Sequence, residues 1–470
     1  MAKPFLARHT WRQLACRKTT TPIIRRRQGI HNVSKQPRRS MTGTTLNPRQ
    51  EDSSSEPQEQ EQLRHRRHGL GKLPLVPLLR SILMQTLMSQ VYVVDTASAL
   101  IKRNMKLLTG NTLFKCVGNK TFYAQFCAGE TESEIQRTLA NLRSLGYKGA
   151  ILTYAKEVEE TRTMHNSSVA QTQASHQAHV DEWLKGTLRT IQYTGAGGFV
   201  GIKYTGAGPE CVRLLGSGSK PDGVIANALD QICATAEKHG ARLLVDAEHH
   251  VQQKAIDSWT LELMKRCNRD GKLVVYNTYQ MYLKESTAIL DAHLQFAEEN
   301  GFNLGIKLVR GAYIGSDPRQ LIHDTKESTD NAYDTAARML ATRHVENPSC
   351  TKIGLVLATH NAESIKKMRD LRQQQLRSGL RLTDLVYAQL MGMADELSLS
   401  LTEKRSDLPE EDIQVVKYVV WGSMKECMMY LLRRAEENRD AVGRTREAQR
   451  ALWQELWGRI LPNNVSKTIR

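Results

Sequence analysis

The chain has 470 residues, 40% hydrophobic and 24% charged, so it can bury a sizeable core in one large or two ordinary domains. Its net charge of +17 raises the question of an acidic partner such as a nucleic acid. However, residues 1–50 hold twelve Lys and Arg and no Asp or Glu, so the remaining 420 residues carry only +5. We therefore expect no nucleic-acid partner for the folded part.

The first 50 residues have the composition of a mitochondrial transit peptide, because they are rich in Arg and free of acidic side chains. In a helix, Ala7, Trp11 and Leu14 would share one face. A basic arm that binds nucleic acid, or a solvated tail, would need no such apolar face. We predict a transit peptide over 1–50 and localisation in the mitochondrion, in the matrix or on the matrix face of the inner membrane.

The eight cysteines are widely spaced and form no C-x-x-C pair, so the sequence predicts neither a zinc site nor a disulfide framework. His249 and His250 lack a carboxylate or Cys partner at the spacing of a metal site, and we expect loop or helix-start residues there. The most apolar segment, 73–94, is interrupted by Arg80, so no membrane-spanning helix is expected.

Folded structure is expected to begin near Leu73, after a polar linker over 51–72 whose composition cannot bury a core. From 73 to 146 the pattern is helical. One predicted helix covers Thr96–Leu108, and another covers Thr131–Leu145, where acidic residues mark its start. The sequence therefore predicts an N-terminal helical arm before the main domain.

After Gly146 the pattern changes to short apolar, β-branched runs separated by helical stretches, which is typical of βα units with parallel strands. The eight predicted strands are Lys148–Tyr154, Gly198–Tyr204, Arg242–Asp246, Lys272–Tyr276, Asn303–Val309, Ile353–Thr359, Asp384–Gln389 and Val415–Val420. They favour an α/β fold of the (βα)8 TIM-type barrel over 147–440, although periodicity leaves a doubly wound sheet open. The polar stretch 157–179 is interpreted as an insertion after the first strand.

Polar residues at the C-terminal ends of the predicted strands form a candidate site, because the loops that follow barrel strands meet at one end. The candidates are Lys203, Asp246, Ala247, Glu248, Asn277, Thr278, Tyr279, Arg310, Gly311, Ala312, Tyr313, Thr359, His360, Asn361 and Tyr418. A single Asp or Asn there is more simply explained as the cap of the next helix. Six strand ends that all carry polar residues favour a shared site.

The predicted helix over Ser423–Asn438 carries Arg433, Arg434 and Glu437. Spacings of three and four residues place Glu437 beside both arginines on one helix face. A guanidinium pair oriented in this way can bind a carboxylate bidentately. A solvated salt-bridge triplet is the simpler alternative, and the helix alone does not decide between them.

Seven collinear segments resemble the proline dehydrogenase family over about residues 120–440. They are T-F-Y-A-Q-F-C-A-G-E from Thr121, L-L-V-D-A-E from Leu243, N-T-Y-Q from Asn277, K-L-V-R-G-A-Y from Lys307, H-D-T-K-E-S-T from His323, A-T-H-N from Ala358 and Y-L-L-R-R-A-E-E-N from Tyr430. Seven segments of this length in one order are improbable by chance.

The resemblance implies a distorted (βα)8 barrel that binds FAD, whose last helix brings the arginine pair to the substrate. Lys203, Arg433 and Arg434 would then pair with the carboxylate of proline, and Glu437 would orient the arginines. The wall around the pyrrolidine ring would consist of Asp246, Leu308, Tyr313 and Tyr418.

The same resemblance implies a set of flavin contacts. These are Asn277, Lys307, Val309, Arg310, Gly311, Lys326, Thr359 and His360. Lys307 stands where several bacterial members have Arg, which keeps a cation but changes the geometry of its donors. Asn277 stands where bacterial members have Gln, which keeps the amide at a shorter reach.

The function implied by the resemblance is FAD-dependent oxidation of L-proline to Δ1-pyrroline-5-carboxylate, the first step of proline catabolism. Hydride would pass from C5 of proline to N5 of the flavin, and the electrons would pass to a quinone. Hydroxyproline dehydrogenase is the nearest alternative, because Tyr418 alone favours proline. A Schiff-base aldolase on the same barrel, with Lys203 as its nucleophile, is a further alternative.

Residues 441–470 are predicted to form an amphipathic helix and a tail. Over Gly443–Ile460, one helical stripe carries Leu452, Trp453, Leu456, Trp457 and Ile460. Packing of this stripe against the barrel and a peripheral contact with the inner membrane are the two alternatives.

Overall fold

The structure is a computed structural model that describes residues 69–156, 169–346, 351–403, 412–440 and 442–461. The predicted transit peptide over 1–50 and nearly all of the predicted linker over 51–72 lie outside the described residues. None of the described helices is long and apolar enough to cross a bilayer.

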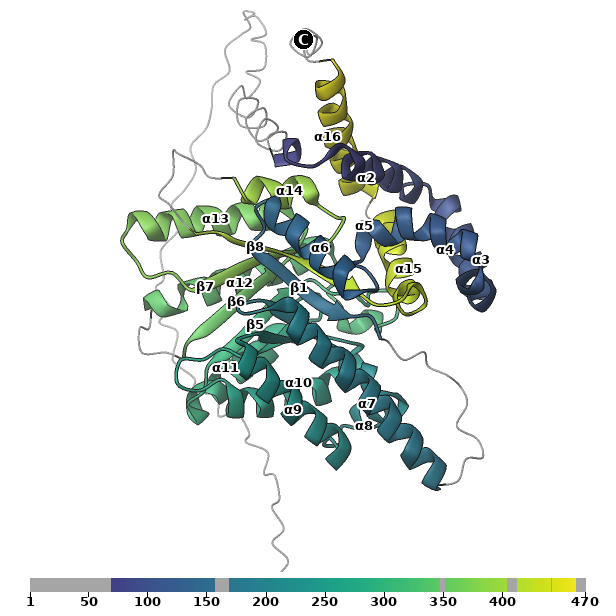
Figure 1. Cartoon of the computed structure of the whole chain (residues 1–470). Helices are drawn as coiled ribbons and strands as arrows, with labels where there is room; N and C mark the ends of the chain where they lie inside the picture. Colours follow the sequence, from purple (N-terminus) through teal and green to yellow (C-terminus); the bar gives the residue numbers. More distant parts are fainter. Residues whose placement is uncertain (1–68, 157–168, 347–350, 404–411, 441, 462–470) are drawn as a thin grey trace, which may run out of the picture. The chain divides into compact units, whose positions relative to one another are not determined.

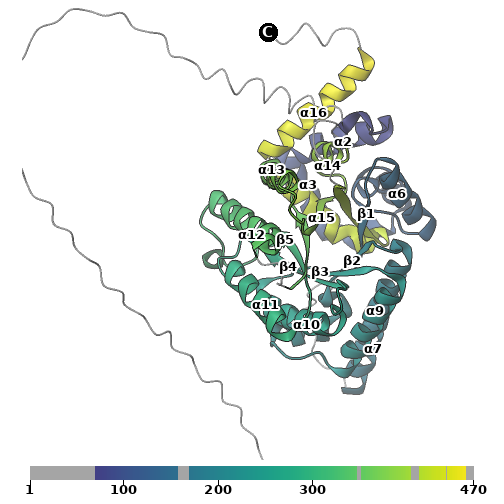
Figure 2. The same ribbon diagram turned by 90° about the vertical axis from the view of Figure 1, so that its left-hand side faces the viewer.

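Eight parallel strands form a closed barrel in chain order (Figures 1 and 2). The strands are β1 (Gly149–Tyr154), β2 (Phe199–Ile202), β3 (Arg242–Val245), β4 (Val275–Gln280), β5 (Leu304–Val309), β6 (Ile353–Ala358), β7 (Asp384–Leu390) and β8 (Gln414–Trp421). β1 pairs with β2 on one side and with β8 on the other, where Ile151 is opposite Tyr418. This closure confirms the predicted (βα)8 barrel and excludes a doubly wound sheet.

Side chains fill the middle of the barrel, because alternate strand residues point inward. Ile151, Phe199 and Tyr276 belong to this inner cluster, and the rings of Phe199 and Tyr276 meet edge to face at 5.4 Å between centroids. Gly354 makes room for them, since a Cβ there would lie 2.4 Å from the hydroxyl oxygen of Tyr276. Space for a ligand is therefore found at the ends of the barrel.

Helices cover the outside of the barrel and pack their apolar faces on the outward strand residues. They are α7 (Val169–Thr194), α8 (Pro209–Gly216), α9 (Gly223–His239), α10 (His250–Cys267), α11 (Ser286–Asn300), α12 (Lys326–Glu346), α13 (Ala362–Arg377) and α14 (Asp395–Leu401), with short 3-10 turns η2 (Tyr204–Ala207) and η3 (Arg319–Leu321). α15 (Met424–Asp440) instead packs with the helices that precede the barrel. Local sequence sets several ends. The Asp222 carboxylate accepts the N–H of Ile225 to start α9, and Gly240 ends it at φ +64°.

The N-terminal helical arm is also present. It consists of α2 (Leu75–Met88), α3 (Val91–Gly110), α4 (Thr112–Gly118), η1 (Asn119–Tyr123), α5 (Ala124–Phe126) and α6 (Glu132–Ser144). A capping box between Thr131 and Glu134 starts α6, one residue from the predicted boundary. Met84 and Phe126 from the arm pack with Met428 and Leu431 of α15, so the arm supports the helix that carries the arginine pair.

The C-terminal helix α16 (Val442–Ile460) divides the predicted stripe between two environments. Leu452 and Leu456 are buried in the main core, where α16 packs along α2 (Figure 1). Trp453, Trp457 and Ile460 remain exposed, at 39%, 51% and 57% of their surface. Core packing is therefore confirmed for part of the stripe only.

Several predicted boundaries were wrong: α3 begins at Val91 rather than at Thr96, and β2 ends at Ile202 rather than at Tyr204. Residues 169–179 of the predicted insertion are the first turns of α7, whereas 157–168 lie outside the described residues. β4 begins at Val275 and continues to Gln280, beyond the predicted Lys272–Tyr276. The reason lies in Asn268, whose Oδ1 accepts the N–H groups of Val274 and Val275 at 2.8 Å and so fixes the start of the strand.

Candidate functional site

A cavity of about 460 Å³ opens at the C-terminal ends of the strands, below α15. Gln85 of α2 and Ala448 of α16 also reach its wall. It brings together most of the predicted site residues: Lys203, Asp246, Lys307, Val309, Arg310, Gly311, Tyr313, Thr359, His360, Tyr418, Arg433, Arg434 and Glu437. Residues from five strand ends and one helix thus meet in one place.

Asp246 is the centre of a buried polar group. Its Oδ1 accepts a hydrogen bond from Lys307 Nζ at 2.6 Å, and its Oδ2 accepts one from the Tyr418 hydroxyl at 2.5 Å. The side chains of Asp246 and Lys307 are 9% and 7% exposed, and the ammonium lies 5.1 Å from the centre of the Tyr418 ring. Burial and the neighbouring Asp246 carboxylate raise the pKa of Tyr418, so its hydroxyl stays protonated and donates.

The arginine pair comes from the last turns of α15. Arg434 donates to Glu437 Oε1 at 2.5 Å, and its guanidinium stacks on Tyr430 with 4.9 Å between the guanidinium carbon and the ring centre. Its side chain is 7% exposed, yet Nε has no hydrogen-bond partner among the described residues. Arg433 lines the same cavity. Because Arg434 is buried, the triplet is not a solvated surface cluster.

Arg310 lines the cavity, but its donors are directed to the protein. Nε pairs with Asp330 at 2.6 Å, and the two terminal nitrogens bond Thr359 Oγ1 and Ser364 Oγ at 2.6 and 2.8 Å. The guanidinium also stacks over Tyr333 at 4.4 Å. Arg310 therefore connects β5 to the helices and strand beside it, and so stiffens this wall.

Three residues with a predicted contact to flavin or substrate do not line the cavity. Asn277 points outward and donates to Asp257 on α10 at 2.8 Å, and Leu308 is buried in the layer between strands and helices. Lys326 begins α12 and pairs with Asp330 at 2.5 Å, with its side chain 68% exposed. Asn277 and Leu308 fall on the outward positions of β4 and β5, since side chains alternate along a strand.

Thr278, one of the strand-end candidates, lines the cavity, and so do three residues that the sequence analysis did not select: Gln280, Gln389 and Tyr430. Thr278 and Gln280 of β4 line the cavity, opposite Lys307 and Val309 in the register of β5. Gln389 of β7 and Tyr430 of α15 line it as well. The two-residue period of β4 could have identified Gln280 from Thr278, had the strand been extended beyond Tyr276.

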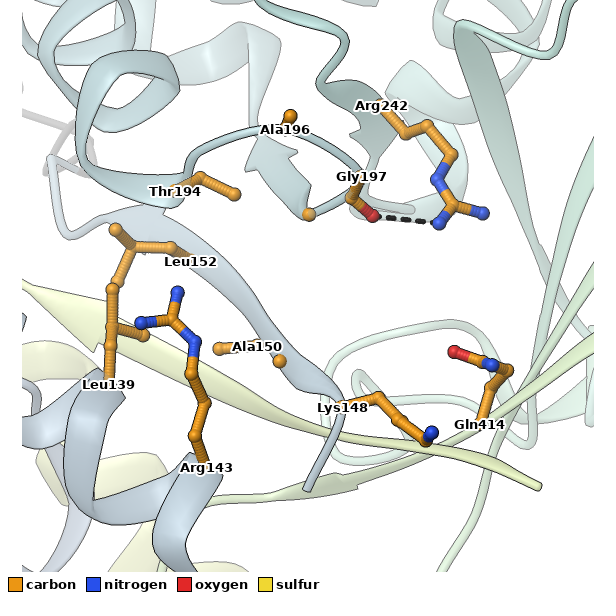
Figure 3. Close-up of a pocket in the computed structure, with 12 residues that line it drawn as sticks. Leu139, Arg143, Lys148, Ala150, Leu152, Thr194, Ala196, Gly197, Arg242 and Gln414 are labelled. Atoms are coloured by element: carbon orange, nitrogen blue, oxygen red, sulfur yellow. Dashed lines mark hydrogen bonds between the residues drawn. The ribbon is translucent and has the colours of Figure 1, made fainter. Parts of the chain in front are cut away.

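A second cavity, of about 310 Å³, lies at the opposite end of the barrel (Figure 3). Arg143, Lys148 and Arg242 surround it, where β1, β2, β3 and β8 begin. Lys148 pairs with Asp412 at 2.8 Å, and Arg242 donates to the Gly197 carbonyl at 2.7 Å. None of the predicted site residues lines this cavity, so the candidate site is the one at the C-terminal ends of the strands.

A family model and several known proteins are similar to this chain over most of its length. The family model described as Proline dehydrogenase matches residues 135–447. A protein named probable mitochondrial proline dehydrogenase, from Schizosaccharomyces pombe, is 28% identical over 396 residues, or 72% of this chain and 80% of the relative. A hydroxyproline dehydrogenase from Mus musculus is 28% identical over 410 residues, or 75% of this chain and 85% of the relative.

Among solved structures, a mutant of proline utilization A from Bradyrhizobium japonicum has the same fold, with a TM-score of 0.54 at 16% identity. The match covers 85% of this chain and 46% of that protein, so this chain spans about half its length. The family model, in contrast, covers more than half of this chain and includes the whole barrel with its arginine helix. The chain therefore belongs to the proline dehydrogenase family of oxidoreductases.

Proposed function

We propose that the protein oxidises L-proline to Δ1-pyrroline-5-carboxylate with FAD as cofactor. The observation that carries the proposal is one cavity that holds both an arginine pair and the buried group of Asp246, Lys307 and Tyr418. Family membership makes the chain an oxidoreductase, so the alternative of a Schiff-base aldolase is wrong.

The cavity has polar groups that fit a large cofactor. Gln389 Oε1 and the Tyr430 hydroxyl are buried in its lining and have no hydrogen-bond partner among the described residues. A ligand rich in donors and acceptors would satisfy them. Bound FAD would accept the hydride from substrate carbon. The residues proposed to hold FAD are Lys307, Val309, Arg310, Gly311, Thr359 and His360.

His360 has a defined hydrogen-bonding state. Its Nε2 accepts the N–H of Leu390 at 3.1 Å, so in the neutral ring the proton is on Nδ1, which can act as a donor. The Thr359 hydroxyl accepts from Arg310, which fixes its orientation. These two neighbours are thus held by the protein before any ligand binds, which lowers the entropy cost of binding.

On the substrate side, Lys203, Arg433 and Arg434 would bind the carboxylate of proline. Two guanidinium groups can hold a carboxylate in a fixed plane, and this orientation supplies much of the rate gain in such a reaction. Glu437 positions Arg434 by the hydrogen bond already described. Asp246 and Tyr418, with Tyr313 nearby, would form the wall against the pyrrolidine ring.

The direct test is anaerobic reduction of the bound flavin. The purified protein should be yellow, and its flavin absorption should be bleached by L-proline and less efficiently by 4-hydroxyproline. Arg433→Met should raise the proline concentration needed for half-reduction while the flavin content stays constant. Failure of L-proline to bleach the flavin would overturn the proposal, and preferential bleaching by hydroxyproline would assign the alternative substrate.

We further propose a mitochondrial location and a quinone as electron acceptor. Relatives from Schizosaccharomyces pombe and Caenorhabditis elegans are among those named as mitochondrial proline dehydrogenases. A fusion of residues 1–50 to a fluorescent protein should be imported into mitochondria. Cytosolic fluorescence would contradict the transit-peptide prediction.

The outer faces of α2 and α16 supply a surface for a lipid-soluble acceptor. The exposed apolar residues on these two adjacent helices are Leu75, Val76, Leu79, Leu83, Leu87, Trp453, Trp457 and Ile460. Trp453 and Trp457 stack with 6.3 Å between ring centroids. An apolar face of this kind can rest in the interfacial region of a bilayer. Both helices also contribute to the wall of the cavity, through Gln85 and Ala448.

Vesicle binding tests this contact. The full chain should sediment with phosphatidylcholine–cardiolipin vesicles, and Trp453→Gln with Trp457→Gln should reduce the bound fraction. A chain that ends before Gly443 tests the whole helix. Undiminished vesicle binding by both variants would exclude a membrane role for α16.

A further inference from the structure

The loop between β5 and α12, residues 310–325, forms one side of the candidate site. Gly311, Ala312 and Tyr313 from this loop line the cavity. A tight turn follows, in which the N–H groups of Ser316 and Asp317 both donate to the Tyr313 carbonyl, at 3.0 and 2.8 Å. The position of Tyr313 therefore depends on where Asp317 is held.

Asp317 is a buried carboxylate in this otherwise exposed part of the loop, with its side chain 1% exposed. Its Oδ1 accepts the N–H of His250 at 3.2 Å, and its Oδ2 accepts the hydroxyl of Tyr282. The imidazole Nδ1 atoms of His249 and His250 lie 3.7 and 3.6 Å from Oδ1. One side chain thus connects the loops that follow β3, β4 and β5.

The neighbours of Asp317 contact Tyr313 in turn. The rings of His249 and Tyr313 lie 4.3 Å apart between centroids, and His249 Nδ1 is 3.2 Å from Ser316 Oγ. His249 is the N-cap residue of α10 and His250 is its first residue, as expected from the sequence. The histidine pair therefore has a structural partner in Asp317 and an aromatic partner in Tyr313.

Tyr282 packs against the start of the same loop. Its ring leaves no room for a side chain at Gly311, where a Cβ would lie 2.3 Å from the Tyr282 ring carbon Cδ1, and Gly311 has φ +151°. The Tyr282 N–H donates to the Arg310 carbonyl at 2.7 Å. Burial, together with Asp317, raises the pKa of Tyr282, so its hydroxyl remains a donor at neutral pH.

We propose that Asp317 is a positioning residue. Its hydrogen bonds hold the loops after β3, β4 and β5 together, and this keeps Tyr313 against the substrate. This inference rests on the proposed function, because it assigns Tyr313 to the wall around the pyrrolidine ring. Asp317 itself does not line the cavity, so it acts through Tyr313. A carboxylate can hold the loops together from a buried position because several donors bind it, since burial of its charge without such donors would cost free energy.

The variants Asp317→Asn and Tyr282→Phe test the proposal, the second by removing only the hydroxyl donor. Each should raise KM for L-proline by about tenfold, the scale of one hydrogen bond to a charged acceptor, with kcat changed less than about twofold. Asp324→Asn is the matched control in the same loop, because Asp324 is 81% exposed and pairs with the exposed Lys284 at the surface. It should leave both constants unchanged.

A double-mutant cycle separates positioning from general destabilisation. In a Tyr313→Ala background, Asp317→Asn should have no further effect on KM, because the side chain that it positions is gone. Equal effects of Asp317→Asn in both backgrounds would overturn the proposal. FAD content and melting temperature are recorded for each variant, and Tyr282→Phe provides the result if Asp317→Asn does not fold.

Amide hydrogen exchange tests whether Asp317 holds the loops together, without a measurement of catalysis. Exchange over 311–317 should be faster in Asp317→Asn than in the unsubstituted protein and unchanged in Asp324→Asn. Unchanged exchange in Asp317→Asn would refute the claim that Asp317 holds this loop in place, whatever the substrate. If instead L-proline does not reduce the flavin of the unsubstituted protein, the proposed function fails while the exchange result still decides the role of Asp317 in the loop.

Discussion

The buried pair of Asp246 and Lys307 allows a quantitative prediction. Asp246→Asn leaves the Lys307 ammonium, 7% exposed, without the carboxylate that lies 2.6 Å away. Breaking a buried ion pair by removing one partner costs about 3–5 kcal/mol, because the other charge is left uncompensated. Lys307→Met should cost a similar amount, since Asp246 then loses its cation and keeps the hydrogen bond from the Tyr418 hydroxyl.

The double variant distinguishes this mechanism from simple damage to the core. Asp246→Asn with Lys307→Met removes both charges, so its destabilisation should be smaller than the sum of the two single changes by about 2–3 kcal/mol. Equilibrium urea unfolding, followed by tryptophan fluorescence in protein freed of flavin, measures each free energy. The exposed pair of Lys284 and Asp324, at 3.1 Å, is the control and should couple by less than about 1 kcal/mol.

Additive effects of the two substitutions on the free energy of unfolding would refute this reasoning. If the three variants show no coupling beyond about 0.5 kcal/mol, Asp246 and Lys307 do not act as a buried pair in solution. Stabilisation by either single substitution would also contradict it, because it would mean that neither charge is buried.

Three further changes have expected outcomes. Thr131→Ala removes the N-cap of α6 and should cost about 1 kcal/mol of stability, seen as a lower urea midpoint with an unchanged slope. Gly311→Ala forces a Cβ against Tyr282 at a positive φ, so it should lower the melting temperature and raise KM for proline; an unchanged KM would contradict the packing. Burial lowers the pKa of His293 from 6.5 to about 4. The folded protein should therefore lose about 3 kcal/mol of unfolding free energy as the pH falls from 6.5 to 4, because the unfolded state binds the proton at a higher pH than the folded state. His293→Gln should remove this part of the acid sensitivity in urea unfolding between pH 6.5 and 4, and an identical pH profile would refute it.

Individual strands could be predicted well because their signal is local. Each of the eight predicted runs overlaps an observed strand, and the capping box at Thr131 marks the start of α6 within one residue. One error arose where a side chain outside the strand decides where the strand begins. Asn268 fixes the start of β4 from outside the strand, which shifts the strand towards its C-terminal residues.

The candidate site shows the same division. Strand ends and the arginine helix were visible as polar residues in fixed places along the chain, and most of them line one cavity. Asn277 and Leu308 were assigned to it although they face outward. Thr278 was among the strand-end candidates, but Gln280 was missed, because the face of a strand residue depends on register with its neighbours.

The sequence by itself determined the order of the βα units, the polar character of the strand ends and the charge of the first 50 residues, because these follow from periodicity and composition. Only the tertiary structure decided that the sheet closes, since closure depends on pairing between β1 and β8, which are far apart in the chain. It also decided that Lys307 and Arg434 are buried, and that Lys307 and Arg310 pair with the distant carboxylates of Asp246 and Asp330. Burial and pairing depend on contacts between distant segments, which no local pattern of residues specifies.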